Sequence, residues 1–268
     1  MPKANTLAQF GNIVRFMARR PGNALELGRK LLHRLRGSLT SFDQAEDLRW
    51  REAHSRSSAD FAQVVEPVLW EEAQAFERAL RARGKAVLAE VPVSFGTGGA
   101  FAFLYWLVRL TKPEIVVETG VAAGWTSTAV LAAMARNDHG HLYSSDFPYF
   151  RQADAERYIG VLVEQDLRDR WTLSTAGDAA TLPRLAAELP AIDLVHYDSD
   201  KSVNGRNFGV PLLHRKVGAG GLVIVDDIAN DGWFRSYVEG GKQTFAVLDR
   251  RFGIIGDLDA LAGARSGR

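Results

Sequence analysis

The segment from Glu118 to Thr126 constrains the fold of this chain more than any other. It reads Glu-Thr-Gly-Val-Ala-Ala-Gly-Trp-Thr, follows the apolar run 115–117 and precedes residues 127–134, which have the composition of a helix. This order predicts a strand, a glycine-rich turn and a helix, because Gly120 and Gly124 let the backbone turn tightly and approach a ligand closely. The helix N-terminus would then offer free N–H groups to a polar ligand.

The spacing of the turn limits what that ligand can be. An acid followed by two glycines four residues apart differs from the Gly-x-Gly-x-x-Gly pattern that cradles a pyrophosphate. Glu118 would repel phosphate groups, whereas it suits a ligand that carries an amino group or hydroxyls. S-adenosylmethionine (SAM) is such a ligand, so the sequence favours it as the cofactor over a nicotinamide dinucleotide.

Strand-like and helix-like segments alternate after Pro113. Such alternation is typical of a parallel sheet with helices on both faces. We therefore predict an α/β fold with a doubly wound, mostly parallel, seven-stranded Rossmann-like sheet and an N-terminal helical extension. The predicted strands are residues 115–118, 141–145, 171–174, 192–197, 222–225, 244–248 and 253–255, and the helices among them are 158–166, 182–189 and 210–216.

The part before this alternation is expected to be helical. Residues 66–83 have helical periodicity, residues 101–110 follow a glycine-rich turn, and residues 38–58 are polar enough to be a linker. We predict a helical extension with an arm and a linker over residues 1–90, and the main α/β domain over residues 91–268.

The first 36 residues are strongly basic, with eight Lys or Arg residues and a single acid, Glu26. They predict a helical arm that packs on the domain or on a second subunit. The alternative is a basic amphipathic element that touches an anionic membrane surface. The sequence does not decide between them, and we expect a homodimer.

Composition argues against several classes of function. A net charge of +1 over 268 residues speaks against nucleic acid as the main partner. The absence of cysteine excludes disulfides, thiolate metal sites and a cysteine nucleophile, and it fits a cytoplasmic enzyme. No apolar stretch approaches the roughly 20 residues that span a bilayer, so we expect no transmembrane segment. The N-terminus also lacks the pattern of a signal peptide.

Acids recur at the ends of the predicted strands. Glu118, Asp146, Asp198 and Asp226 each stand at this position, where ligands bind in open α/β sheets. Asp146 follows the second strand, where a carboxylate can accept both hydroxyls of a ribose, although it can also be an ordinary turn residue. Asp178 follows the third strand, where it can accept from an adenine amino group or cap the next helix.

Asp198, Asp226 and Asp227 form a second group of candidates. Three carboxylates at neighbouring strand ends repel one another unless a cation joins them, and oxygen ligands suit Mg²⁺ or another divalent cation. Lys201 comes three residues after Asp198 and is a candidate base, or else one half of a solvated surface pair. His196 is a second candidate base, or a histidine of the core.

These motifs resemble class I SAM-dependent methyltransferases, and among them the metal-dependent O-methyltransferases, over residues 92–228. Residues 116–126 are similar to the SAM loop of the catechol and caffeoyl-CoA O-methyltransferases, and Asp198-Ser-Asp-Lys201 is similar to their Asp-Ala-Asp-Lys. The resemblance implies that Asp198 binds metal, that Lys201 helps to deprotonate the acceptor, and that residues 91–268 are a SAM-dependent methyltransferase domain. The candidate cofactor residues are Glu118, Gly120 and Thr126 for the methionine part of SAM, Asp146 for the ribose, Asp178 and Ala179 for the adenine, and in addition Gly124 and Asp198.

One departure from the family pattern bears on the acceptor. The family's next metal pair is usually Asp-Asn, whereas this chain has Asp226-Asp227. An acidic pair recurs in the macrolide-sugar O-methyltransferases, which place a base, often His, where this chain has Lys201. The chain also resembles the bacterial methyltransferase 24 group.

The resemblance thus implies an enzyme that methylates a hydroxyl of a small molecule or saccharide, with a sugar-type hydroxyl favoured over a phenol or catechol. Metal-independent N- or C-methylation is the alternative. An NAD-dependent oxidoreductase and a non-catalytic SAM-binding protein are more distant alternatives.

Overall fold

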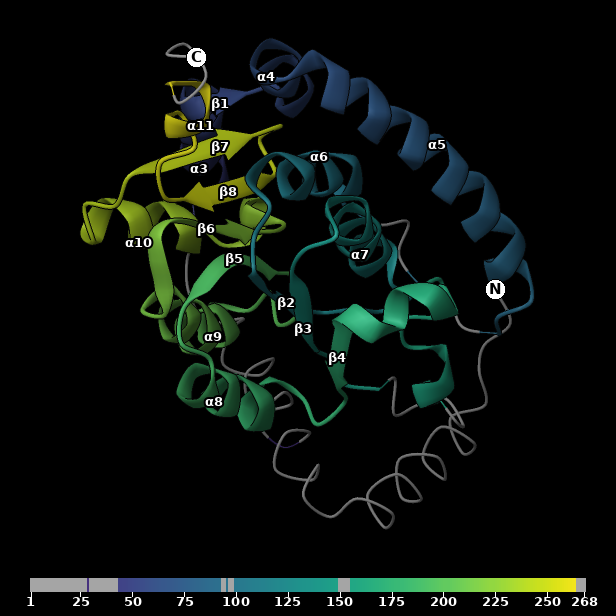
Figure 1. Cartoon of the computed structure of the whole chain (residues 1–268). Coiled ribbons are helices and arrows are strands. Elements are labelled where there is room, and N and C mark those ends of the chain that lie inside the picture. Colours follow the sequence, from purple (N-terminus) through teal and green to yellow (C-terminus); the bar gives the residue numbers. More distant parts are fainter. Residues whose placement is uncertain (1–27, 29–42, 93–94, 96–98, 149–154, 264–268) are drawn as a thin grey trace.

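Eight strands form one mostly parallel sheet in the computed structural model, which describes residues 28, 43–92, 95, 99–148 and 155–263 (Figure 1). Along the chain they are β1 (Ser55–Arg56), β2 (Ile115–Thr119), β3 (His141–Ser145), β4 (Trp171–Ser174), β5 (Ile192–Tyr197), β6 (Val217–Val225), β7 (Phe245–Leu248) and β8 (Phe252–Ile255). Their order across the sheet is β1-β7-β8-β6-β5-β2-β3-β4, and β8 runs antiparallel to β6 and β7. The chain proceeds outward from β2 to β4 and then returns to β5, so the strand order reverses between β2 and β5.

The predicted α/β fold and its sheet are confirmed. β3, β4 and β5 coincide with predicted strands, and β2, β7 and β8 differ from them by one residue at one end. β6 begins at Val217 rather than at Leu222. The glycine-rich residues between these two positions belong to the strand, and its register with β5 shifts there. β1 is an additional strand of two residues, too short to leave a pattern in the sequence.

The linker predicted at residues 38–58 is wrong over its described part. Helix α3 (Gln44–His54) occupies most of it, and Asp43 caps this helix by accepting hydrogen bonds from two backbone N–H groups at 2.9 Å. Trp50 of α3 is buried and stacks on Phe245 of β7, with ring centroids 5.4 Å apart. The helix carries few apolar residues, so hydrophobic periodicity could not reveal it.

Helices cover both faces of the sheet (Figure 1). One face packs against α4 (Ser58–Val65), α5 (Pro67–Ala89), α6 (Phe101–Thr111) and α7 (Trp125–Asn137). The other face packs against α3, α8 (Asp178–Glu188), α9 (Val203–His214) and α10 (Trp233–Gly240). The last described helix is α11 (Ala260–Gly263). Side chains between the helices and the sheet form one apolar core on each face.

The long helix α5 explains why α6 can be apolar on all sides. Residues 101–108 are all buried, because α7 and the sheet cover one side of α6 and α5 covers the other. Glu72 of α5 joins the two helices, accepting from the Tyr105 hydroxyl at 2.5 Å and from Arg109 Nε at 2.9 Å. The helices predicted at 66–83 and 101–110 are thus confirmed, and the domain boundary at residue 90 stays a prediction.

The helix predicted at residues 158–166 is wrong. Two short 3₁₀ turns, Ala155–Tyr158 and Gln165–Arg170, flank this segment instead, and Gly160 interrupts it with a left-handed backbone, φ 66°. The segment binds the turn after β2: the N–H of Gly160 donates to the Ala122 carbonyl oxygen at 2.9 Å, and that of Leu162 donates to Ala123 at 3.0 Å. It therefore fixes the glycine-rich turn from outside.

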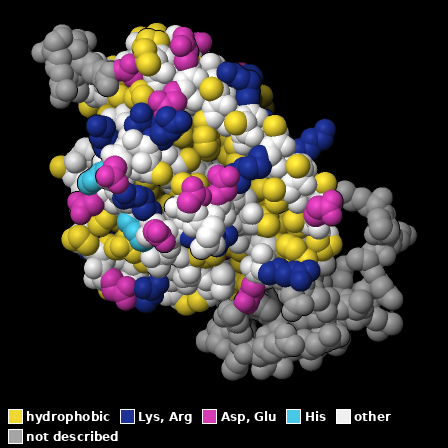
Figure 2. All heavy atoms as spheres, turned by 45° about the vertical axis from the view of Figure 1, so that its right-hand side comes forward, with side chains coloured by type: hydrophobic (Ala, Val, Ile, Leu, Met, Phe, Trp, Pro, Cys, Tyr) yellow, Lys and Arg dark blue, Asp and Glu magenta, His cyan; other side chains and the backbone are white. Residues whose placement is uncertain are grey.

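The basic arm predicted in residues 1–36 lies outside the described residues, apart from Gly28. Within the described part of the chain, no helix combines the length and the apolar character of a membrane span. On the face shown in Figure 2, acidic and basic side chains lie interspersed across the described surface.

Candidate functional site

The predicted acids gather at one edge of the sheet. Glu118 lies in β2, Asp146 follows β3, Asp178 opens α8 after β4, and Asp198 and Asp226 follow β5 and β6. Because these strands are parallel, their carboxyl ends share one edge, and a ligand crevice is expected where the strand order reverses. A cavity of about 300 Å³ opens there, between the glycine-rich turn and the aspartates. A larger hollow of about 880 Å³, between α3 and α10, is lined by none of the predicted site residues.

Gly120 and Gly124 shape the turn beside this cavity. Both have left-handed backbones, with φ of 84° and 92°. A Cβ atom on Gly120 would lie 2.5 Å from the carbonyl oxygen of Asp198, and one on Gly124 would lie 2.9 Å from Cα of Gly160. Both positions therefore require glycine, and Gly120 does so because the turn after β2 packs directly on the end of β5.

Glu118 is buried beneath the turn and accepts three hydroxyl hydrogen bonds. The hydroxyl of Thr126 donates at 2.5 Å, that of Ser127 at 2.6 Å and that of Ser144 at 2.9 Å. Two predicted cofactor residues, Glu118 and Thr126, are therefore bonded to each other, and Glu118 fastens the start of α7 to β2 and β3. The sequence did not single out Ser127 or Ser144, because neither has a distinctive spacing.

Asp146 holds the same turn from the side of β3. Its Oδ2 accepts from the N–H groups of Val121 and Ala122 at 3.1 and 2.7 Å, and its Oδ1 accepts from the N–H of Phe147 at 2.6 Å. These contacts orient the carboxylate against the glycine-rich turn. Its role toward a ribose stays a prediction.

Asp178 is buried at the start of α8 and uses both carboxylate oxygens inside the protein. Oδ1 accepts from the Ser145 hydroxyl at 2.8 Å, and Oδ2 accepts from the hydroxyl of Ser199, in the loop after β5. Ala179 is the next residue of α8. The adenine roles of Asp178 and Ala179 stay predictions.

Asp198, Asp226 and Asp227 come together in one cluster. Each offers a carboxylate oxygen, and these oxygens all lie within 4.8 Å of one another. Asp226 is buried, with 2% of its surface exposed, whereas Asp198 and Asp227 are half-buried. Across the residues that the structure describes, this is the one cluster of its kind.

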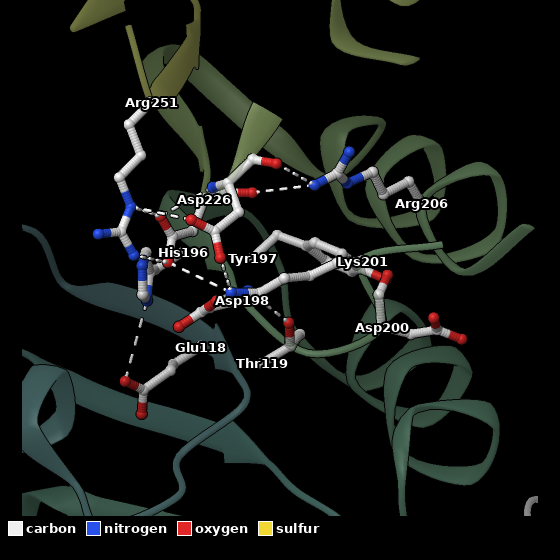
Figure 3. Close-up of polar contacts among 11 residues, drawn as sticks. Glu118, Thr119, His196, Tyr197, Asp198, Asp200, Lys201, Arg206, Asp226 and Arg251 are labelled. Carbon is white, nitrogen blue, oxygen red and sulfur yellow. Dashed lines mark hydrogen bonds and ion pairs between the residues drawn. The ribbon is translucent and has the colours of Figure 1, made fainter. Parts of the chain in front are cut away.

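Lys201 points into the aspartate cluster (Figure 3). Its Nζ lies 2.7 Å from Asp198 Oδ1 and 3.6 Å from Asp226 Oδ2, and it donates a hydrogen bond to Asp227. Burial lowers the pKa of Lys201, but the three carboxylates outweigh burial and raise it above its usual value. The side chain is therefore an ammonium ion here, and its role as a base, which would require it to leave these carboxylates, stays a prediction.

Burial also sets the charges of the aspartates. It raises the pKa of Asp198, and the charge of Asp226 raises it further. Burial acts in the same direction on Asp226, but a hydrogen bond with Asp198 and the charges of Lys201 and Arg251 lower the pKa of Asp226 overall. Asp226 is thus the more readily ionised of the two.

His196 lies in β5 opposite Glu118 and is buried. Its Nδ1 has no hydrogen-bond partner and is 4.0 Å from Glu118 Oε1. Burial lowers the pKa of His196, despite the nearby charge of Glu118, so the imidazole is neutral. Its role as a base stays a prediction.

Two arginines that the sequence did not single out hold the aspartates from opposite sides (Figure 3). Arg206 of α9 is fully buried, and its Nη2 donates to the carbonyl oxygens of Asp226 and Asp227 at 3.1 and 2.8 Å, while its Nη1 pairs with Asp231 at 2.6 Å. Arg251 follows β7, and its Nε is 3.1 Å from Asp226 Oδ1 and 2.9 Å from Asp227 Oδ1. Both arginines lie at least 20 positions along the chain from these aspartates, so no local spacing in the sequence could predict their contacts.

The donor set of the cluster fits a hard divalent cation. The ligands are oxygens only, from the ends of two neighbouring strands, as Mg²⁺ prefers. Asp198 Oδ1 is buried, and its one close polar neighbour among the described residues is the ammonium group of Lys201, at 2.7 Å, so this oxygen already faces a cation. Arg206 meanwhile donates to the carbonyl oxygen of Asp227, whose backbone has a left-handed conformation, φ 52°.

Residues 117–228 match the sequence model of the methyltransferase 24 family, which is described as a methyltransferase domain. The match begins in β2 and ends one residue beyond Asp227, so it contains the glycine-rich turn and all three aspartates. No curated protein matches the chain significantly.

Several solved structures have a similar fold. The methyltransferase PaMTH1 of Podospora anserina, bound to S-adenosylhomocysteine (SAH), is 14% identical, and the alignment covers 66% of this chain and 87% of that one with a TM-score of 0.52. The O-methyltransferase of Bacillus cereus in complex with SAH is 18% identical over 70% and 89% of the two chains, with a TM-score of 0.46. The O-methyltransferase TomG of Streptomyces achromogenes, which is involved in tomaymycin synthesis and was solved with SAM, is 17% identical over 68% and 87%, with a TM-score of 0.46. At these identities the likeness concerns the fold alone, and the PaMTH1 structure is the one that supports it.

Proposed function

We propose, from the match of residues 117–228 to a methyltransferase domain and from the Rossmann-like fold, that the protein is a SAM-dependent O-methyltransferase that requires a divalent cation. Asp198, Asp226 and Asp227 would hold Mg²⁺ or another divalent cation. The acceptor would be a hydroxyl of a small molecule or saccharide. A sugar-type hydroxyl is favoured over a phenol or catechol, because the Asp226-Asp227 pair resembles that of the macrolide-sugar enzymes.

One observation carries this proposal. The glycine-rich turn and the three-aspartate cluster line the same cavity of about 300 Å³, with Gly120 packed against the carbonyl of Asp198. A methyl donor on the turn and an oxygen at the aspartates would therefore be neighbours. A protein accelerates such a transfer mainly by holding the two reacting groups at attack distance.

The side of the cavity formed by the turn suits SAM. The N-terminus of α7 faces the turn, and helix N-termini attract polar and anionic groups; Glu118 lies beneath the turn, near the expected position of the amino group. Asp146 and Asp178 stand in order at the ends of β3 and β4, as contacts to a ribose and an adenine would require. PaMTH1, whose fold is similar, was solved with SAH.

The aspartate side suits the acceptor. A divalent cation bound there would lower the pKa of the acceptor hydroxyl and orient its oxygen. Lys201 is placed to take part in moving the hydroxyl proton, because its Nζ is the one lysine group that lines the cavity among the described residues. Arg206 and Arg251 keep the two adjacent aspartates in place from opposite sides.

Transfer of a labelled methyl group from SAM tests the proposal. The full-length protein is assayed against sugars, polysaccharide precursors and catechols, with Mg²⁺, with EDTA, and with EDTA followed by excess Mg²⁺. We expect transfer that EDTA abolishes and Mg²⁺ restores, together with calorimetric binding of SAM in both conditions. Full activity in EDTA would refute the metal role, and absence of SAM binding would refute the cofactor.

Metal-independent N- or C-methylation is the second candidate, and one observation favours it. Lys201 and Arg251 already pair with all three aspartates, so part of the cluster's charge is neutralised without an ion. In that case EDTA would leave transfer unchanged and the cluster would not bind Mg²⁺ in calorimetry. The same assay therefore decides between the two candidates.

Assembly and location are part of the same proposal. A homodimer in the cytoplasm fits the absence of cysteine and the predicted basic arm. Light scattering of the full-length protein tests the dimer, and the mass of a monomer across the micromolar range would refute it.

A further inference from the structure

Arg251 is held in place by a tight turn. Asp249 and Arg250 both have left-handed backbones, with φ of 54° and 55°, and the Arg251 N–H donates to the Leu248 carbonyl oxygen at 3.0 Å. This is the two-residue turn that suits a β-hairpin. The Arg251 carbonyl oxygen in turn accepts from the Ile228 N–H at 3.0 Å. The hairpin and the loop after β6 are therefore fixed to each other.

The guanidinium group of Arg251 is used only in part within the described chain. Nε contacts both aspartates, and Nη2 is 3.3 Å from Asp226 Oδ2, but Nη1 makes no hydrogen bond to a described residue. The side chain is 45% exposed, compared with 2% for Asp226, and it lines the cavity. Toward the described residues, its Nη1 group therefore keeps N–H donors that a ligand in the cavity could use.

The balance of charge around the cavity favours an anionic ligand once a cation is bound. With every group ionised, the three aspartates, Lys201 and Arg251 carry one net negative charge, which a divalent cation reverses to one positive charge. The sulfonium group of SAM adds a further positive charge. A cleft of one sign raises the local concentration of a ligand of the opposite sign, and the planar fork of an arginine matches carboxylate and phosphate groups.

We infer that the acceptor carries a carboxylate or phosphate group beside the hydroxyl that is methylated, and that Arg251 binds this group. Uronic acids and sugar phosphates have this chemistry. The inference rests on the proposed function and narrows its substrate class. It makes Arg251 a determinant of specificity in addition to a counter-ion for the aspartates.

Matched acceptors test this inference. Glucose, glucuronate and glucose 6-phosphate are compared as acceptors, alongside catechol and 3,4-dihydroxybenzoate, with labelled SAM and Mg²⁺. We expect kcat/KM for a charged acceptor to exceed that for its neutral partner by about tenfold. The relative rates of glucuronate and glucose 6-phosphate distinguish a carboxylate from a phosphate.

The Arg251→Gln variant should bring the charged-to-neutral ratio close to one, mainly by raising KM for the charged acceptor. A role as counter-ion alone would lower kcat/KM for both acceptors equally and leave the ratio unchanged, which would overturn the inference. Arg250→Gln is the matched control, because Arg250 stands on the same turn, is 62% exposed and pairs with Glu52 away from the cavity at 3.6 Å. It should keep the wild-type ratio.

A binding measurement separates this inference from the proposed function. Sulfate is titrated by calorimetry into protein loaded with Mg²⁺ and SAH, for the wild type and for Arg251→Gln. We expect the wild type to bind sulfate about tenfold more tightly. Equal sulfate affinity in the two proteins would overturn the inference even if methyl transfer is confirmed. If sulfate binding depends on Arg251 while no hydroxyl is methylated, the anion site stands and the proposed reaction fails.

Discussion

Two groups of carboxylates at this edge of the sheet have partners of opposite kinds. On the loop side, at the ends of β2, β3 and β4, the acids Glu118, Asp146 and Asp178 accept hydrogen bonds from hydroxyls and N–H groups of the protein itself. On the aspartate side, at the ends of β5 and β6, three carboxylates crowd together, and their partners are the cationic groups of Lys201 and Arg251.

This difference separates two reasons for placing an acid at a strand end. A carboxylate that receives several hydrogen bonds stabilises a backbone shape, here the turn that would bind the cofactor. Carboxylates that face one another cost free energy unless cations offset their repulsion, so their persistence indicates a site for charge. Under the proposed function, the loop side would be a scaffold for the cofactor, and the aspartate side would receive a cation.

The largest expected effect comes from removing one charge on the aspartate side. Asp226→Asn should lower metal-stimulated methyl transfer by roughly 100-fold, because the amide oxygen is neutral and attracts a divalent cation less strongly than the carboxylate does. SAM affinity should change by less than about threefold, since Asp226 lies outside the loop side. Single-turnover transfer and calorimetry with SAM measure the two effects.

Asp169→Asn is the matched control for this change, because Asp169 is exposed and has no hydrogen bond or ion pair to a described residue. Equal losses of transfer and of SAM binding in Asp226→Asn would contradict the division into two sides.

The second largest effect is expected for Arg206, which positions the backbone of the aspartate side. Arg206→Met removes the donor to the carbonyl oxygens of Asp226 and Asp227, so metal affinity should fall by about 10- to 100-fold, as for other groups that orient metal ligands. SAM affinity should not change. Arg206→Lys keeps the charge and should restore part of the metal affinity.

A thermal melt accompanies both Arg206 variants, because leaving Asp231 unpaired destabilises the fold by itself. If the metal affinity of Arg206→Lys equals that of Arg206→Met while only the melting temperature recovers, the role of Arg206 is structural.

How far the sequence predicts this site depends on the range of the contacts. The turn with Gly120 and Gly124 was predictable, because its chemistry lies within nine consecutive residues. The aspartates at the ends of β5 and β6 were predictable because the carboxyl ends of parallel strands meet at one edge. The sequence pattern could not tell that Glu118 accepts from neutral hydroxyls while Asp198 pairs with an ammonium group, because both acids stand at the same kind of position.

The contacts made by residues distant in sequence were not predictable. Arg251 reaches the aspartates from a hairpin, and Arg206 from the middle of α9, so only the folded chain shows what they bind. Helix α3 was missed for a different reason: its packing depends on Trp50 rather than on an apolar stripe. A feature is predictable from sequence when its contacts join residues close in the chain or when its apolar residues recur with a regular period.

Gly120 and Gly124 offer a smaller but more discriminating test of the comparison. Gly120→Ala would place a Cβ against the end of β5, whereas Gly124→Ala would place one against Gly160, on the loop side alone. Each substitution should cost on the order of 1–3 kcal/mol of unfolding free energy at its left-handed backbone. Gly120→Ala should weaken both SAM and metal binding, and Gly124→Ala should weaken SAM binding only.

Calorimetry with each ligand, together with thermal melts, reads these outcomes for the two glycines. If the two variants have similar melting temperatures, each serves as the control for the other, because a difference in ligand binding then does not come from a difference in stability. Loss of metal binding in Gly124→Ala would mean that the two sides do not respond separately.

The smallest expected effect concerns Ser199, which joins the two sides. It stands next to Asp198 in the loop after β5, yet its hydroxyl donates to Asp178 on the loop side. Ser199→Ala should cost about 1 kcal/mol of stability, because one oxygen of a buried carboxylate loses a donor. Metal affinity should stay the same and SAM affinity should change by less than about threefold, because Ser145 still holds the other oxygen of Asp178. A large loss of metal affinity in this variant would show that the aspartate side takes its geometry from the loop side, and the separation of scaffold from cation receptor would fail.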